Sequence, residues 1–210
     1  MKQGGTRVPA VEKTICELWG VPHAIACSSG TAALHLAAVA CGVEPGDEVI
    51  LNPTTDWGTI CGLLAIGAVP VFADVHPDTL SLDPAAVAGT ITPRTRAIIL
   101  VHFAGYPAHV KEIVTLARRH NVKVIEDCAQ SPLAMLDGRP LGVFGDVGAF
   151  SANDSKHVSC GEGGFVTLHD DEMDRIGRLF IDKAYERNKA RGQTDVTFLG
   201  FNYRMSELSA

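Results

Sequence analysis

The chain has 210 residues, of which 46% are hydrophobic and 20% are charged, and this composition is typical of a globular domain with a sizeable core. Its net charge of −6 argues against nucleic acid or an anionic membrane as the main partner. The six cysteines form no CxxC pair, so we expect reduced thiols and no metal site. The longest apolar stretch, residues 60–73, is shorter than the ~18 residues of a membrane span, and the N-terminus is polar. We therefore expect a cytoplasmic protein that does not enter a membrane.

Strand patterns alternate with helical patterns along the chain. Helices are expected at residues 9–19, 32–42, 57–67, 108–120 and 170–184, and a further helix should begin at Asp83. The strands expected between them cover residues 23–28, 44–52, 69–74, 97–103, 123–131, 147–150 and 165–169. This alternation predicts an α/β fold with three layers, αβα, in which a mainly parallel sheet lies between helices. We expect residues 185–195 to form a charged surface loop and the last residues to begin another helix.

Parallel sheets of this kind bind ligands at the carboxyl ends of their strands, and three features lie there. Residues 28–31, SSGT, stand between a strand and a helix, where free N–H groups and the helix dipole favour an anion, although an ordinary N-cap explains the same residues. Lys156 lies in a glycine-rich loop after a strand and is either a Schiff-base lysine or a solvated surface residue. Asp127 ends a strand, where a carboxylate also commonly caps a loop. The motifs of dinucleotide-binding proteins, P-loop ATPases, serine hydrolases and zinc proteases are absent.

Five segments together resemble the sugar aminotransferases of the DegT/DnrJ/EryC1/StrS family, and these are SSGTAAL, PTTDW, EDCAQS, FSANDSKHVSCGEGG and GFNYRMSEL. They follow the family's order and extend over nearly the whole chain. Members of this family are pyridoxal 5′-phosphate enzymes of fold type I, and the resemblance implies this fold and this cofactor. Because members are usually much longer, residues 1–210 are expected to be the cofactor-binding large domain alone, with the C-terminal small domain missing.

The resemblance also implies roles at the ring of the cofactor. Lys156 resembles the lysine that forms a Schiff base with the cofactor. Asp127 resembles the carboxylate that pairs with the pyridine nitrogen and keeps it protonated, so that the ring can accept electrons. Gln130 resembles the residue near the O3′ edge of the ring, and Trp57 resembles the aromatic residue that stacks on its face.

Further matches concern the phosphate group of the cofactor. Gly30, Thr31 and Ser151 match the phosphate-binding positions, in agreement with the anion site expected at the start of the helix. Asn202 matches an asparagine that reaches the phosphate of the cofactor in the neighbouring subunit. The resemblance therefore implies a homodimer with shared active sites.

The implied reaction is a ping-pong transamination with glutamate as the usual amino donor and a keto sugar on a nucleotide diphosphate as the acceptor. Such reactions belong to amino-sugar, polysaccharide or secondary-metabolite biosynthesis, and the partners are small molecules. Three alternatives stay open: a sugar dehydratase, an aminotransferase of a carbocycle, and a cofactor-binding paralogue without turnover. Dehydratases of this family carry histidine in place of the Schiff-base lysine, so Lys156 argues against the first alternative, although His157 is adjacent.

Overall fold

The computed structural model describes residues 5–188 and 193–210. Its helices are α1 (Arg7–Trp19), α2 (Gly30–Ala40), α3 (Trp57–Ile66), α4 (Pro84–Thr90), the short 3₁₀ helix η1 (Phe103–Gly105), α5 (Val110–Arg119) and α6 (Asp171–Ile181). Its strands are β1 (His23–Cys27), β2 (Glu48–Leu51), β3 (Val69–Phe72), β4 (Thr95–Val101), β5 (Lys123–Asp127), β6 (Met135–Leu136), β7 (Arg139–Pro140), β8 (Val147–Ser151), β9 (Gly164–Leu168), β10 (Tyr185–Asn188) and β11 (Gln193–Val196). Among the described residues, every helix is too short or too polar to cross a bilayer.

Seven of the described strands form one sheet in the order β1-β9-β8-β5-β4-β2-β3. The strands β3, β2, β4, β5 and β8 pair in parallel, whereas β9 runs antiparallel to both of its neighbours, β1 and β8. The mainly parallel sheet that the sequence predicts is therefore confirmed, with one reversed strand. The central strands β4 and β5 are buried almost throughout, and the sequence of β4, TRAIILV, is accordingly a nearly continuous apolar run.

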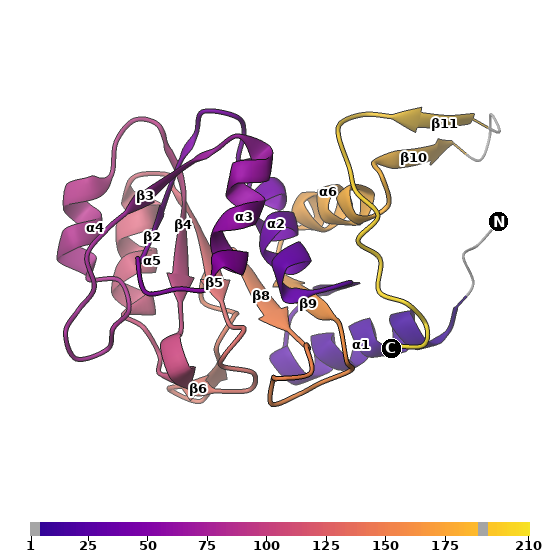
Figure 1. The fold of residues 1–210 in the computed structure, drawn as a ribbon, viewed down its shortest axis with the longest axis horizontal. Helices are drawn as coiled ribbons and strands as arrows, with labels where there is room; N and C mark the ends of the chain where they lie inside the picture. The colour runs from indigo at the N-terminus through magenta and orange to yellow at the C-terminus, as the bar shows by residue number, and fades with distance from the viewer. Residues whose placement is uncertain (1–4, 189–192) are drawn as a thin grey trace.

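Two apolar clusters fill the spaces on the two faces of this sheet. One cluster includes side chains of α2, α3 and α6, and the other includes side chains of α1, α4 and α5 (Figure 1). The sequence of α2, GTAALHLAAVA, is apolar nearly all round, and its small side chains allow the helix to lie close to β8 and β9. The three-layer αβα architecture expected from the sequence is therefore confirmed.

The segment after α6 differs from the sequence prediction. Residues 185–195 were expected to form a loop, but β10 and β11 form an antiparallel hairpin with Tyr185 opposite Val196, while residues 189–192 lie outside the described residues. The prediction gave too much weight to the charges, because alternate residues of a strand point to opposite faces and a hairpin exposed to water can carry charge on both. Tyr185 and Val196 also belong to residue types that favour strands.

The last residues of the chain turn back toward the start of α1. The carboxylate of Glu207 accepts hydrogen bonds from the backbone N–H groups of Arg7 at 2.8 Å and Val8 at 3.2 Å, and so satisfies free donors at the N-terminus of α1. Figure 1 shows this proximity of the C-terminus to α1. The expected final helix amounts within the described residues to one turn, closed by the hydrogen bond from Ala210 N–H to the carbonyl of Ser206.

Candidate active site

A cavity of about 280 Å³ opens at the carboxyl-terminal edge of the sheet. The ends of β4, β5 and β8 and the first turns of α2 and α3 surround it. This is the edge at which parallel α/β sheets bind ligands. The structure brings six of the eight predicted site residues to this cavity: Gly30, Thr31, Asp127, Gln130, Ser151 and Lys156.

Asp127 is the last residue of β5 and is almost completely buried at this cavity. Its Oδ1 accepts a hydrogen bond from Ala129 N–H at 3.0 Å, and its Oδ2 accepts one from the hydroxyl of Thr59 at 2.8 Å. Burial raises the pKa of Asp127 above its ordinary value, although these two hydrogen bonds and the positive charge of Lys156 act against the rise. A protonated nitrogen bound beside this carboxylate would therefore be favourable for both groups, because it would balance a buried negative charge.

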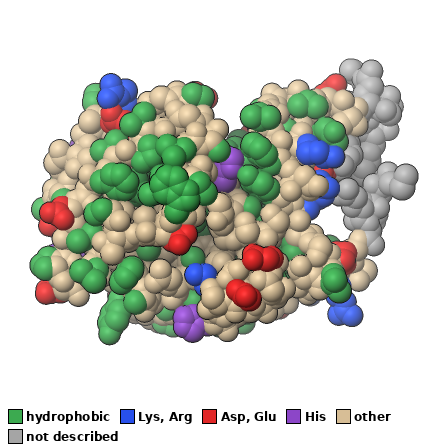
Figure 2. Space-filling model, in the orientation of Figure 1, with side chains coloured by type: hydrophobic (Ala, Val, Ile, Leu, Met, Phe, Trp, Pro, Cys, Tyr) green, Lys and Arg blue, Asp and Glu red, His purple; other side chains and the backbone are tan. Residues whose placement is uncertain are grey.

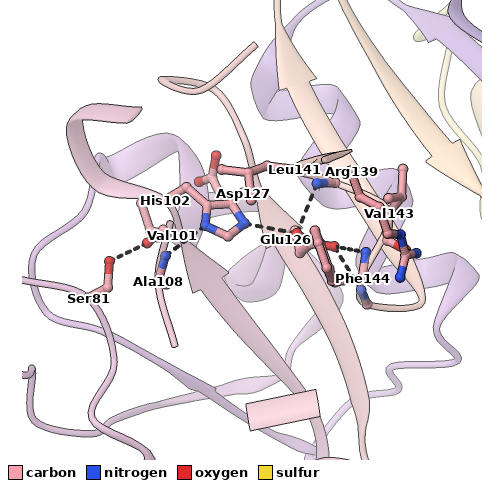
Figure 3. A network of polar contacts seen from close by, with 12 residues as sticks. Ser81, Val101, His102, Ala108, Glu126, Asp127, Arg139, Leu141, Val143 and Phe144 are labelled. Carbon is pink, nitrogen blue, oxygen red and sulfur yellow. Dashed lines mark hydrogen bonds and ion pairs between the residues drawn. The ribbon is translucent and has the colours of Figure 1, made fainter. Parts of the chain in front are cut away.

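Glu126 precedes Asp127 on the strand and is also fully buried, but its carboxylate has a different environment. Four N–H donors surround it (Figure 3). Its Oε2 accepts from His102 Nε2 and Gly142 N, both at 2.9 Å, and its Oε1 accepts from Phe144 N and Gly145 N, both at 2.7 Å. Burial would raise the pKa of Glu126, but the hydrogen bonds from His102 and from the backbone outweigh burial and hold the pKa below its ordinary value. The Glu126 carboxylate is therefore ionised and fully bonded.

His102, Glu126 and Cys128 have donor atoms within 4.8 Å of one another, which raises the question of a metal site. However, His102 Nδ1 accepts the N–H of Ala108 at 3.1 Å, so its Nε2 carries the proton that is donated to Glu126. Burial, together with the charge of Glu126, raises the pKa of the Cys128 thiol well above its ordinary value, so the thiolate that metals require is disfavoured. His102 and Glu126 are thus bound up in a hydrogen-bond network, and their ligand atoms are not free for a metal ion.

The first turn of α2 meets the end of β8 at the cavity. The hydroxyl of Ser29 caps α2 by accepting a backbone N–H at 3.1 Å. Gly30 lies so close to Ser151 that a β-carbon on Gly30 would be 2.6 Å from the β-carbon of Ser151, and a β-carbon on Gly58 of α3 would be 2.8 Å from Thr31 Oγ1. The positive end of the α2 dipole and the hydroxyls of Thr31 and Ser151 thus face a narrow space that suits a phosphate group.

Lys156 is half-buried in the loop between β8 and β9, and its side chain lines the cavity. Asn153 organises this loop: its carbonyl accepts Lys156 N–H at 3.0 Å, and its side-chain Oδ1 accepts from Ser155 N at 3.1 Å and Ser155 Oγ at 2.8 Å. The Asn153 Nδ2 donates to Glu162 Oε1 at 2.9 Å and so ties the two ends of the loop together. The backbone of Lys156 is therefore fixed while its amine faces the cavity.

Within the described part of the chain, Gln130 bonds through only half of its side-chain amide. Its Oε1 accepts the backbone N–H of Ala104 at 2.8 Å, in a turn where Ala104 has a left-handed φ of 52°. Because the oxygen holds this turn, the side-chain NH₂ group is the part that can donate to a ligand in the cavity.

Two predicted site residues do not line the cavity. Trp57 is the first residue of α3 and is 65% exposed, whereas its neighbours Asp56 and Gly58 line the cavity. In Figure 2 apolar side chains gather over α3, which is where Trp57 lies. Asn202 is exposed in the C-terminal segment, where it forms a β-bridge with Asp182. The roles expected for Trp57 and Asn202 stay predictions.

Six further polar residues line the cavity that sequence reasoning did not single out: Thr55, Asp56, Thr59, Asn153, Ser155 and Glu162. The sequence contains one feature that could have identified Thr59, because this hydroxyl residue lies within the otherwise apolar helix WGTICGLLAI. Asn153 and Glu162 flank Lys156 in the loop motif, but nothing in the sequence indicates that they bond to each other.

This donor set fits a cofactor that carries a phosphate, a carbonyl and a basic ring nitrogen. The helix N-terminus and its hydroxyls suit the phosphate, the amine of Lys156 suits the carbonyl, and the buried carboxylate of Asp127 suits the nitrogen. Fold and site together define the class of pyridoxal-phosphate enzymes of fold type I. Within this class, the chain belongs to the DegT/DnrJ/EryC1/StrS aminotransferase family, whose model matches residues 1–210.

The names of curated relatives point to several kinds of substrate. The chain is 40% identical to GDP-perosamine synthase of Caulobacter vibrioides over 206 residues, which cover 98% of this chain and 55% of the relative. It is 42% identical to a UDP-N-acetyl-3-dehydro-alpha-D-glucosamine 3-aminotransferase of Acidithiobacillus ferrooxidans, with coverage of 98% and 55%. It is 41% identical to L-glutamine:2-deoxy-scyllo-inosose aminotransferase of Streptomyces kanamyceticus, with coverage of 90% and 46%. The chain thus spans about half the length of the relatives it matches.

Solved structures share the fold over the same portion. An aminotransferase from Psychrobacter cryohalolentis matches with a TM-score of 0.91 at 36% identity, covering 98% of this chain and 54% of that protein. The structure of NtdA from Bacillus subtilis with bound cofactor PMP matches with a TM-score of 0.90 at 32% identity, covering 98% and 46%. These matches confirm the fold type I architecture predicted from the sequence.

Proposed function

We propose that residues 1–210 form the cofactor-binding portion of a pyridoxal-phosphate-dependent aminotransferase that converts a keto sugar linked to a nucleotide into an amino sugar, with glutamate as the amino donor. The observation that supports this proposal is the cavity itself, which is lined by Lys156, the buried Asp127 and the N-terminus of α2. A second domain and the rest of the substrate site would lie outside these residues, since the relatives are about twice as long.

In this proposal each residue of the cavity has a definite task. Thr31, Ser151 and the N-terminus of α2 bind the phosphate, Asp127 accepts a hydrogen bond from the ring nitrogen, and the free amide N–H of Gln130 donates to the ring oxygen. The amine of Lys156 binds the carbonyl carbon. Pyridoxal phosphate, when bound, supplies a ring that withdraws electrons from the α-carbon of the amino donor. Once the amino donor has displaced it from the carbonyl carbon, the freed Lys156 Nζ would take the proton from that α-carbon as a general base and return a proton as a general acid.

The names of the relatives support two kinds of acceptor. Two of the three relatives above bear names of nucleotide-sugar enzymes, which supports a nucleotide-linked keto sugar. The name of the third specifies a carbocycle and glutamine, which supports the second candidate, a carbocycle aminotransferase. Amine formation from a panel of keto-sugar nucleotides and from scyllo-inosose derivatives, each with glutamate and with glutamine, would separate the two candidates.

We further propose a homodimer in which Asn202 reaches the phosphate site of the partner and Trp57 contacts the ring only in the assembled enzyme. Both residues are exposed here, and such exposure is what the proposal requires of groups that function at an interface. Sedimentation of the chain with and without cofactor tests the dimer. A cofactor affinity in Asn202→Ala equal to that of the wild type would contradict the role of Asn202.

The direct test of the proposed function is covalent capture of the cofactor. The chain is incubated with pyridoxal phosphate, reduced with borohydride and digested, and mass mapping should place the pyridoxyl group on Lys156. Lys156→Arg should lose the label, whereas Lys111→Arg, which changes an exposed lysine paired with Asp137, should keep it. A label on another lysine, or none at all, would refute the proposal. Glutamate added to the loaded chain should change the absorbance of the cofactor, a change that a paralogue without turnover would not show.

A further inference from the structure

Two threonine hydroxyls of the cavity form a chain that ends on Asp127. The hydroxyl of Thr59 donates to Asp127 Oδ2 at 2.8 Å, and the hydroxyl of Thr55 lies 2.8 Å from the hydroxyl oxygen of Thr59. An ionised carboxylate only accepts hydrogen bonds, so the single hydrogen of the Thr59 hydroxyl must point to Asp127. The oxygen of Thr59 must then accept from Thr55, and the direction of both bonds is fixed.

This chain links elements that are otherwise separate at the cavity. Thr55 precedes α3, Thr59 lies in its first turn with 2% exposure, and Asp127 ends β5. On the other side of the carboxylate, Ala129 N–H donates to Oδ1. Each carboxylate oxygen therefore has one donor on its own side, which fixes the plane of the group and leaves further lone pairs for a ligand.

We propose that Thr59 is a positioning residue for Asp127, supported by Thr55, and that the two hydroxyls orient the carboxylate and favour its ionised form at the cavity. This inference rests on the proposed function, because it assigns the ring nitrogen of the cofactor to Asp127. A fixed hydroxyl donor stabilises the anion where burial would otherwise protonate it. A protonated carboxyl group could not balance the charge of a protonated ring nitrogen, so the loss of Thr59 should weaken that pairing.

The first test uses the cofactor-free chain and follows the carboxyl carbon of Asp127 by NMR as the pH is changed, with Asp127→Asn identifying the signal. Thr59→Val keeps the shape of the side chain and removes the hydroxyl. It should raise the pKa of Asp127 by about 1–2 units, since a hydrogen bond to a charged group contributes that much. Thr59→Ser should keep the wild-type value. Thr90→Val is the matched control, because the Thr90 hydroxyl bonds to the carbonyl of Ala86 in α4.

Thr55→Val provides a second measurement that leaves Thr59 in place, and it should raise the pKa of Asp127 by less than Thr59→Val does.

In the loaded chain, Thr59→Val should also shift the pH dependence of the cofactor absorbance and slow the glutamate half-reaction about tenfold or more, with Thr59→Ser restoring both. An unchanged Asp127 pKa in Thr59→Val, or in Thr55→Val if Thr59→Val does not fold, would overturn the proposal. A shift of the Asp127 pKa in Thr59→Ser equal to that in Thr59→Val would also overturn it. Because the titration needs no cofactor, this outcome is independent of the labelling of Lys156.

Discussion

Glu126 and Asp127 are consecutive residues of β5, yet their carboxylates point in different directions and differ in their hydrogen-bond partners (Figure 3). Glu126 accepts four hydrogen bonds from within the protein, whereas Asp127 accepts two and lines the cavity. The alternation of side chains along a strand produces this difference. One carboxylate therefore fixes the loop after β7, and the other is left for a ligand.

Glu126→Gln should destabilise the chain by about 2–4 kcal/mol. The NH₂ group of glutamine would face two of the four N–H donors, which would then be buried without an acceptor. Urea denaturation of the cofactor-free chain measures the loss. The control is Glu172→Gln, which removes an exposed ion pair with Arg175 and should cost less than ~1 kcal/mol. Equal losses of unfolding free energy in the two variants would show that the buried hydrogen bonds of Glu126 stabilise the chain no more than an exposed ion pair does.

Asp127→Asn should stabilise the cofactor-free chain at pH 7 while it slows the glutamate half-reaction. The pKa of Asp127 is higher in the folded chain than in the unfolded chain, so the folded state binds the proton more tightly. The stability of the wild type therefore falls as the pH rises from the unfolded pKa, about 3.9, through the folded pKa. Asparagine has no charge to bury, and each kcal/mol gained would raise Tm by about 2–4 °C.

The comparison for this variant is Asp195→Asn, which changes an exposed residue of β11 and should leave the Tm nearly unchanged. A lower Tm for Asp127→Asn than for the wild type at pH 7 would contradict the buried-charge argument. A half-reaction at the wild-type rate would separately contradict the pairing of Asp127 with the ring nitrogen.

The main features of the fold could be predicted because the apolar pattern determines them. A buried parallel strand such as β4, TRAIILV, is recognisable from its run of apolar residues, and an amphipathic helix such as α5 from the spacing of its apolar residues. The hairpin β10–β11 could not be predicted in the same way, because the exposed strands carry no apolar alternation. The reversal of β9 also depends on pairing between distant residues, which a local pattern does not contain.

The sequence predicts the site residues that belong to recognisable motifs. It does not predict residues whose role comes from a hydrogen bond to a distant part of the chain. Lys156 and Asp127 belong to recognisable segments, and the structure brings both to one cavity. Thr59 escaped notice because its importance comes from a hydrogen bond across 68 positions of sequence. Trp57 belongs to a recognisable segment but lies outside this cavity, so its contact with the ring stays a prediction for the assembled enzyme.

Gly30→Ala should weaken the binding of pyridoxal phosphate by at least tenfold. The added β-carbon would lie 2.6 Å from the β-carbon of Ser151, so α2 or β8 would have to move at the phosphate site. Gly89→Ala is the matched control, because a β-carbon there meets no atom within 4 Å and alanine favours the helix α4. Absorbance titration with the cofactor measures both variants. If Gly30→Ala bound the cofactor as tightly as Gly89→Ala, the assignment of the phosphate site to the α2 N-terminus would be wrong.

The stability of the chain should also decrease on acidification because of His35. This histidine is buried on α2, where its ring packs against Phe180 at 4.8 Å and its Nδ1 lies 3.3 Å from the hydroxyl of Tyr203. Burial lowers the pKa of His35 to about 4, whereas an unfolded chain has a histidine pKa of about 6.5. Between these values the unfolded state binds more protons, so stability is lost as the pH falls through this window.

His35→Gln should remove most of this pH dependence, because glutamine does not titrate and can still bond to Tyr203. The loss between pH 7.5 and pH 4.5 should be about 2–3 kcal/mol larger in the wild type than in the variant. Asp127 acts in the opposite direction over part of this range, but it does so equally in both proteins, so the difference isolates His35. Urea denaturation at pH 7.5, 6.5, 5.5 and 4.5 provides the measurement. Parallel stability curves for the two proteins would show that the buried imidazole of His35 does not limit the stability of the chain in acid.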